Sequence, residues 1–231
     1  MFYAFLRWLM RFVTHTYLVG LFHVSGRERV PRTGPVLVCA NHASTVDPPM
    51  VPAFLPRGDS WSMAKSEYFA KPNFTKWLFG HYHAFPVVRH SLDRKSLKRA
   101  FEVLREGHAL VVYPEGTRIE AGGLQRAEPG AGFIAQLSGA PVQPVGLVGT
   151  RECFRKGSFW PRRVRVEVRF GRPFRLRDRR EDGSRVDRQD AADAVMARIA
   201  ELLPEAMRGE YSDLEGLRRR LGDLYVEDAA G

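Results

Sequence analysis

Cysteine is scarce in this sequence. Cys39 and Cys153 are the only cysteines among 231 residues, and Cys39 lies inside an apolar run. A disulfide framework is therefore not expected, and a reducing compartment is the simpler interpretation. Because His42 lies three residues after Cys39, a thiolate nucleophile remains an alternative to a small buried side chain.

Long uninterrupted apolar runs are also lacking. Residues 1–24 are rich in aromatic and aliphatic side chains, but Arg7, Arg11 and His15 interrupt them at intervals of four. A membrane span needs about 20 mostly apolar residues, and a secretory signal carries its charges ahead of the apolar core. The pattern predicts an amphipathic helix in a membrane interface, with arginines reaching anionic headgroups. The alternative is a helix packed on the core.

Acidic residues are fewer than basic ones: the sequence has 26 Asp and Glu against 36 Lys and Arg, which gives a net charge of +10. Such a charge favours an anionic partner. Residues 151–188 are rich in arginine, but no recognition helix, RNA-binding signature or zinc-finger spacing accompanies them. We therefore expect a solvated face there, with headgroup contact as the alternative, and no nucleic-acid partner.

A metal-binding pattern is missing as well. His81 and His83 alternate near a predicted strand, but no carboxylate or cysteine at ligand spacing joins them. No metal is predicted.

What the sequence does contain is a set of short apolar runs separated by helical patterns. The runs at residues 36–40, 84–88, 109–113 and 142–148 predict strands buried on both faces. Helical spacing follows at residues 94–106, 131–138, 190–207 and 213–224. Residues 164–170 alternate strictly and predict an edge strand with one wet face. Residues 25–231 are thus expected to form a single α/β domain, with a mostly parallel central sheet covered by helices.

One predicted strand breaks off into the polar stretch "NHASTVDPP". His42 and Asp47 lie five residues apart, which on a continuous helix would separate them by about 140°. A turn must intervene if they meet, and Asp47 before Pro48 predicts an N-cap with proline at the first helical position. A histidine oriented by a carboxylate is a general base. A substrate hydroxyl is its favoured target, with Ser44 as an alternative nucleophile and a purely structural pair as the competing interpretation.

Two further strands are followed by polar residues. Glu115, Gly116, Thr117 and Arg118 come after one of them, and Arg89 comes after another. The ends of parallel strands share one edge of an open sheet, where ligands bind. Hydroxyls, a flexible glycine and guanidinium groups suit a substrate that carries a hydroxyl and a phosphate.

These residues amount to a family resemblance. "NHASTVDP" resembles the N-H-x4-D block of the glycerolipid acyltransferases, the family of lysophosphatidic acid acyltransferases. "AFPVVR" resembles the family's second block, "YPEGTR" its F-P-E-G-T-R block with Tyr113 in place of Phe, and "APVQPVGLVG" its fourth block. The order and spacing match over residues 25–148.

The resemblance implies roles for individual residues. His42 would be the general base and Asp47 its orienting partner, with direct attack of the acceptor oxygen on an acyl thioester. The glycerol phosphate would be held by residues after the second and third strands, which are Arg89, Glu115, Gly116, Thr117 and Arg118. Pro144 would shape the acyl-donor side. Lys65 aligns with a lysine common in the family and would meet phosphate, and a solvated lysine is the alternative.

The resemblance also implies an activity and a location. The expected reaction moves a fatty acyl group from acyl-CoA or acyl carrier protein to 1-acylglycerol-3-phosphate, giving phosphatidic acid without a resident cofactor. The expected partners are these substrates, a membrane surface with anionic lipids and, as a candidate, acyl carrier protein. The protein would lie peripherally on the cytoplasmic face of the cell membrane. The alternatives are another lysolipid, a glycolipid or an aminolipid as acceptor, and a non-catalytic lipid-binding module of the same fold.

Overall fold

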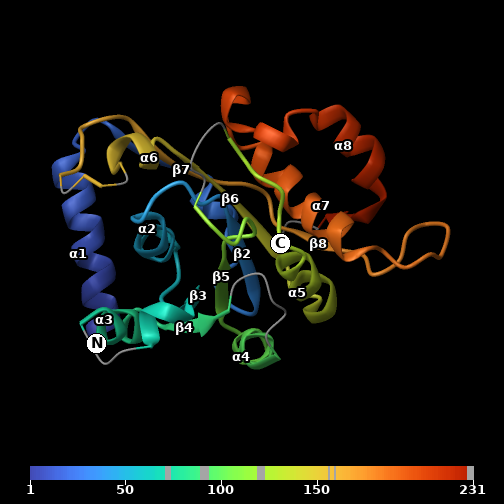
Figure 1. Cartoon of the computed structure of the whole chain (residues 1–231), viewed down its shortest axis with the longest axis horizontal. Helices are drawn as coiled ribbons and strands as arrows, with labels where there is room; N and C mark the ends of the chain where they lie inside the picture. Colours follow the sequence, from blue (N-terminus) through green and yellow to red (C-terminus); the bar gives the residue numbers. More distant parts are fainter. Residues whose placement is uncertain (71–73, 89–93, 119–122, 156, 159, 228–231) are drawn as a thin grey trace.

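The computed structural model describes residues 1–70, 74–88, 94–118, 123–155, 157–158 and 160–227, and in this part of the chain the strands form one sheet between two layers of helices (Figure 1). The α-helices are α1 (Phe2–Tyr17), α2 (Asp47–Phe54), α3 (Phe74–His81), α4 (Arg94–Arg105), α5 (Gly130–Ser138), α6 (Thr150–Cys153), α7 (Arg188–Ala200) and α8 (Leu214–Leu221). The strands are β1 (Phe22–Ser25), β2 (Val36–Ala40), β3 (Ser60–Lys65), β4 (Ala84–Val87), β5 (Ala109–Val112), β6 (Val142–Val148), β7 (Val166–Phe170), β8 (Phe174–Leu176) and β9 (Tyr225–Glu227).

The sheet is mostly parallel, as predicted. Its strand order is β1-β7-β6-β2-β5-β3-β4, with β8 beside β6 and β9 beside β8. The run from β6 to β4 is parallel throughout, whereas β7 and β8 pair antiparallel with β6. The carboxyl ends of β2, β5, β3 and β4 therefore meet at one edge, which is the edge where the polar residues follow.

The two faces of the sheet are covered by different helices. On β2, Leu37 and Cys39 face the core formed with α4, α5, α7 and α8, whereas Val36, Val38 and Ala40 face the core formed with α2. Every residue of β2 is buried. Burying a Val or Leu side chain contributes about 1.5–3 kcal/mol, so the apolar runs of the sequence are explained by the double covering.

The predicted edge strand is in a different place. β7 lies between β1 and β6, so its assignment to the sheet's edge is wrong. β1 extends the sheet beyond it and was not predicted, because four residues that include His23 and Ser25 carry no apolar run. The charged face of β7 is neutralised by pairing, since Arg169 Nη2 lies 2.8 Å from Glu167 Oε2.

The arginines of α1 face the protein. Arg7 is 8% exposed and donates to the carbonyl oxygens of Pro52, at 2.9 Å, and Leu55, at 2.8 Å. Arg11 donates to the carbonyls of Ala53 and Leu55. The last carbonyls of a helix have no partner within the helix, so both guanidinium groups cap the end of α2. The prediction that these arginines reach lipid headgroups is wrong.

The opposite face of α1 is apolar and exposed. Its exposed large side chains are Phe2, Phe5, Trp8, Leu9, Phe12 and Val13. His15, the third member of the predicted polar stripe, is exposed as well, and its Nδ1 donates to the carbonyl of Arg11. Within the described ranges, no helix combines the length and the apolarity that crossing a bilayer requires.

Candidate functional site

The site is built on the turn between β2 and α2, residues 41–46, here called the His42 turn. The strand ends at Ala40 and the helix begins at Asp47, so the chain reverses within these six residues. The reversal brings His42 Nδ1 to 3.0 Å from Asp47 Oδ2. Both side chains are buried, and no part of Asp47 is exposed. The two residues singled out by their spacing are therefore in contact.

The carboxylate of Asp47 organises the whole turn. Its Oδ2 also accepts the backbone N–H groups of Ala43, at 2.7 Å, and Ser44, at 2.6 Å. The two prolines that follow Asp47 have no N–H to offer, so the carboxylate points back into the turn. The N-cap of α2 is Val46 rather than Asp47, and the predicted cap is wrong by one residue.

The hydrogen bond to Asp47 assigns the tautomer of His42. An ionised carboxylate only accepts hydrogen bonds, so in the neutral imidazole Nδ1 carries the proton and Nε2 has the lone pair. His42 is 8% exposed and forms part of a cavity wall. An imidazole in this state can remove a proton from a hydroxyl group bound in that cavity.

Glu115 braces the same turn from β5. Its Oε1 accepts the backbone N–H of His42 and its Oε2 accepts that of Gln125, both at 3.0 Å. The residue is 3% exposed, and burial raises the pKa of its carboxyl group to about 7 although both N–H groups act in the opposite direction. Glu115 is absent from the described wall of the cavity. Its position thus supports a role in holding His42, and not the predicted contact with phosphate.

Asn41 fixes the turn to the neighbouring strand. Its side chain donates to the carbonyl of Leu147, at 3.0 Å, and accepts the N–H of the same residue at 2.7 Å. The end of β2 is thereby tied to β6. No role was predicted for Asn41, although its place directly before His42 in the first block was a signal.

The cavity beside His42 has a volume of about 680 Å³. Its wall is mainly apolar and comes from β3, α3, β4, α4 and α5, with Met63, Leu78, Phe79, Val87, Leu97 and Ile134 among its members. Thr45 and Tyr113 lie in the wall next to His42, and the ring centroids of Tyr113 and His42 are 4.5 Å apart. Such a cavity suits a substrate with a reactive polar group and a long apolar chain.

Three of the predicted phosphate contacts share this cavity. Gly116, Arg118 and Lys65 all line it. The φ of Gly116 is +65°, a conformation that favours glycine, and a Cβ there would lie 3.1 Å from a side-chain carbon of Glu128. Lys65 Nζ lies 2.8 Å from Glu67 Oε1, with its side chain 35% exposed. The described wall therefore contains two cations, Lys65 and Arg118, and one carboxylate, that of Glu128.

Other predicted residues are elsewhere. Arg89 lies outside the described residues. Thr117 is half-buried and does not belong to the described cavity wall. Pro144 is buried in the middle of β6, opposite Cys39 of β2, and does not belong to that wall either. Its position gives no support to a role on the acyl-donor side.

The alternative nucleophiles are poorly placed. Cys39 is fully buried, and burial raises the pKa of its thiol far above the ordinary value. Ser44 is 2% exposed, and its hydroxyl donates to the carbonyl of Phe154 at 3.2 Å. Neither residue belongs to the described wall of the cavity. The geometry favours proton removal from a bound hydroxyl over an enzyme-bound intermediate.

The two alternating histidines have separate surroundings. His81 Nδ1 donates to the carbonyl of Trp77 at 2.8 Å. The ring of His83 stacks between those of Tyr3 and Trp61. In the described segments no group of three or more His, Cys, Asp or Glu side chains could hold a metal ion.

Comparison with known proteins agrees with this geometry. The model of a family described as Acyltransferase matches residues 21–148. A 1-acyl-sn-glycerol-3-phosphate acyltransferase of Bacillus subtilis is 31% identical over 147 residues, which cover 61% of this chain and 70% of that protein. The chloroplastic relative BAT2 of Brassica napus is 31% identical over 141 residues, 58% of this chain.

The extent of these matches differs among the relatives. The aligned part of the chain spans only 39% of the Brassica napus protein and 49% of a relative from Cocos nucifera. The crystal structure of the 1-acyl-sn-glycerophosphate acyltransferase PlsC from Thermotoga maritima superposes with a TM-score of 0.65 at 26% identity. That superposition covers 85% of this chain and 79% of the other.

Proposed function

The chain belongs to the acyltransferase family, and on that premise we propose that it transfers a fatty acyl group from a thioester to the hydroxyl group of a lysophospholipid. The acceptor we propose is 1-acylglycerol-3-phosphate, which the names of its relatives from Bacillus subtilis and Brassica napus contain. One observation carries the proposal. The contact between His42 and Asp47 lies at the rim of an apolar cavity whose wall contains cations.

The proposed step needs only a base and an oriented substrate. Nε2 of His42 removes the proton of the acceptor hydroxyl while its oxygen forms a bond to the thioester carbonyl carbon. The carbon–sulfur bond then breaks, and the leaving thiolate takes the proton back from the imidazolium. Asp47 stabilises that imidazolium through the hydrogen bond of 3.0 Å. No acyl-enzyme, resident cofactor or metal enters this scheme.

The cavity wall has charged and apolar residues, which would bind different parts of the substrates. Lys65 and Arg118 both line the cavity, and either cation would attract a phosphate group. The apolar wall would take an alkyl chain, whose burial contributes about 0.8 kcal/mol for each CH₂ group. The acceptor hydroxyl would then lie between them, next to His42.

The location we propose is the cytoplasmic surface of the cell membrane, with α1 lying in the interface. The outer face of α1 is apolar and exposed, and Trp77 of α3 extends it, since its ring centroid is 5.1 Å from that of Phe2. The net charge of +10 favours anionic lipids. Because substrates and product carry long alkyl chains, an enzyme held in the interface can exchange them without moving a chain through water.

A panel of donors and acceptors tests this proposal. The purified chain is incubated with vesicles and one radiolabelled donor, which is either acyl-CoA or an acylated acyl carrier protein. One acceptor is added at a time: 1-acylglycerol-3-phosphate, glycerol 3-phosphate, another lysophospholipid, or a glycolipid. We expect labelled phosphatidic acid as the main product. The panel also decides between the two donors.

Two variants complete the design. His42→Ala should lower the turnover by at least about 10²-fold. His23→Ala, at an exposed position of β1, should leave it unchanged. Near-normal turnover by His42→Ala would end the general-base assignment. Vesicle binding without transfer to any acceptor would favour the non-catalytic lipid-binding module.

A further inference from the structure

Residues 123–128, here called the brace segment, join the His42 turn to the arginine-rich C-terminal third of the chain. The N–H of Gln125 donates to Glu115 Oε2 at 3.0 Å. The N–H of Glu128 donates to the carbonyl of Pro114 at 2.9 Å. The brace segment therefore holds one of the two oxygens of Glu115, while the other oxygen holds His42.

The brace segment is seated on residues 207–211 by backbone contact. The N–H of Leu124 donates to the carbonyl of Met207 at 2.9 Å, and the N–H of Glu210 donates back to the carbonyl of Leu124 at 3.0 Å. Gly209 has a φ of +49°, and a Cβ there would lie only 2.2 Å from the oxygen of Leu124. This close approach leaves the segment little freedom to shift.

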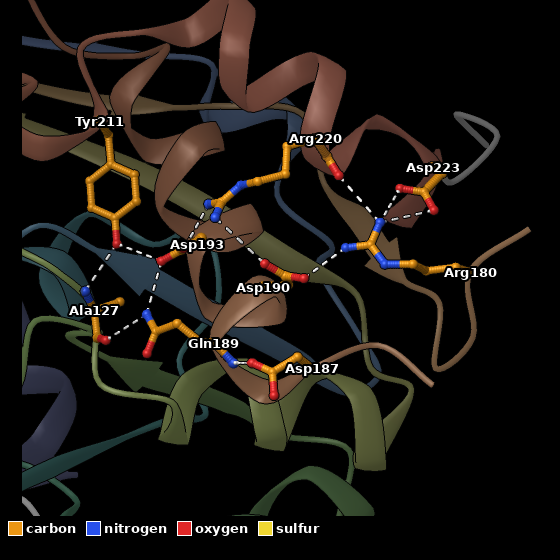
Figure 2. A network of polar contacts seen from close by, with 9 residues as sticks. All are labelled: Ala127, Arg180, Asp187, Gln189, Asp190, Asp193, Tyr211, Arg220 and Asp223. Atoms are coloured by element: carbon orange, nitrogen blue, oxygen red, sulfur yellow. Dashed lines mark hydrogen bonds and ion pairs between the residues drawn. The ribbon is translucent and has the colours of Figure 1, made fainter. Parts of the chain in front are cut away.

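Tyr211 fixes the far part of the segment. As Figure 2 shows, its hydroxyl accepts the N–H of Ala127 and donates to Asp193 Oδ1, both at 3.0 Å. Gln189 Nε2 donates to the carbonyl of Ala127 at 3.1 Å and to the same Asp193 oxygen at 2.9 Å. Both backbone polar groups of Ala127 are thus held by side chains, one from α7 and one from the 3₁₀ helix Gly209–Tyr211.

Ion pairs from the arginine-rich third keep this arrangement in place. Arg220 Nη2 lies 2.6 Å from Asp193 Oδ2 and its Nη1 lies 3.7 Å from Asp190. Arg180 pairs with the other oxygen of Asp190, at 2.7 Å, and with Asp223 at 2.9 Å (Figure 2). Asp193 therefore presents a fixed acceptor to the hydroxyl of Tyr211.

We propose that Tyr211 is a positioning residue for acyl transfer. Its hydroxyl fixes the brace segment, the segment fixes Glu115, and Glu115 fixes the backbone of His42. A displacement of about 1 Å in a catalytic group can cost up to 10²-fold in rate, so a loosened segment would be felt at the reacting atoms. The inference rests on the proposed role of His42 as the base.

Tyr211→Phe tests the proposal with Tyr225→Phe as its matched control. The hydroxyl of Tyr225 also donates to α7, to the carbonyl of Ala194 at 3.0 Å, but not to the brace segment. We expect kcat of the full chain to fall about fivefold in Tyr211→Phe, with the KM of the acyl donor unchanged. The control should keep both values. Equal kcat in wild type and Tyr211→Phe would overturn the proposal.

A double-mutant cycle separates positioning from general destabilisation. If Tyr211 acts through Glu115, Tyr211→Phe should change kcat by less than about twofold once Glu115→Gln is present, since residues that act through one contact are not additive. A fivefold loss in both backgrounds would show that Tyr211 does not act through Glu115.

Amide hydrogen exchange supplies a readout that needs no turnover. In Tyr211→Phe, exchange should become faster in peptides that cover residues 123–128 and in those that cover residues 41–46, and in neither for Tyr225→Phe. Faster exchange confined to residues 123–128 would overturn the proposal. Because no substrate is present, this result is independent of the panel that tests the acyl transfer itself.

Discussion

The His42 turn and helix α1 both place polar side chains at regular spacings, and the protein uses the two sets in opposite ways. In the turn, His42 and Asp47 meet and His42 faces a cavity that can receive substrate. In α1, Arg7 and Arg11 turn away from solvent and bind the last carbonyls of α2. The sequence suggested that the polar side chains of both regions contact an external ligand, and the geometry fits such contact only for those of the turn.

The difference follows from where the partners lie in the chain. The groups that Asp47 holds are three to five residues away, so the spacing alone constrains the contact. The carbonyls that Arg7 holds are 45 and 48 residues away, and no local pattern reveals them. The two regions are nevertheless connected, because Asp47 begins α2 and the arginines cap its other end. Figure 1 shows α2 next to α1.

Removing the charge of Asp47 in the His42 turn should cause the greatest loss of activity. Asp47→Asn keeps the shape of the side chain but removes the charge that stabilises the imidazolium. We expect kcat to fall about 10²- to 10⁴-fold, with the circular dichroism spectrum preserved. Steady-state kinetics with the best donor and acceptor of the panel measure it. A loss of only a few-fold would mean that Asp47 serves the turn and not the reaction.

Removing the cap of α2 should lower the stability of the fold. Arg7→Met keeps the length of the side chain but leaves the carbonyls of Pro52 and Leu55 without their donor. Hydrogen bonds from a charged group contribute about 1.5–3 kcal/mol each, so we expect a loss of about 3 kcal/mol in the free energy of unfolding, measured in urea. Arg105→Met, on the exposed part of α4, is the control. Equal stability of both variants would contradict the inward orientation of Arg7.

Much of the fold could be predicted because, as in the His42 turn, it depends on patterns within a few neighbouring residues. β2 and β6 lie between neighbours and are buried on both faces, so their apolar runs identify them. β3, Ser60–Lys65, was missed because serines fall on its buried positions and interrupt the pattern. In the site, the contact of His42 with Asp47 could be predicted, but the brace by Glu115 could not. It depends on a backbone N–H at residue 125 that only the folded chain brings near.

Glu115 adds a contact between distant segments to the turn, and its carboxyl group titrates differently in the folded and the unfolded chain. Burial raises its pKa from 4.5 to about 7, so the folded chain holds the proton more tightly than the unfolded chain. The resulting stabilisation is complete below about pH 4.5 and is lost as the pH rises through 7.

Glu115→Gln has no such titration. Between about pH 5 and pH 8 its stability relative to wild type should therefore rise by on the order of 2 kcal/mol, measured by urea unfolding at each pH. Glu215→Gln, at an exposed position on α8, should show no such change. A pH-independent difference for Glu115→Gln would mean that this carboxyl group titrates as an exposed one does.

The smallest effect concerns the outer face of α1. Because the arginines of this helix are engaged with α2, binding to a lipid surface should depend on its aromatic face. Phe12 is 54% exposed, and burying such a side chain contributes about 1.5–3 kcal/mol. Phe12→Ala should weaken binding to anionic vesicles about tenfold, measured by co-sedimentation, with little change in stability. Leu137→Ala on α5, where the side chain is 66% exposed, should bind as wild type does. If Phe12→Ala binds the vesicles as tightly as wild type does, the exposed aromatic face of α1 does not contact the membrane.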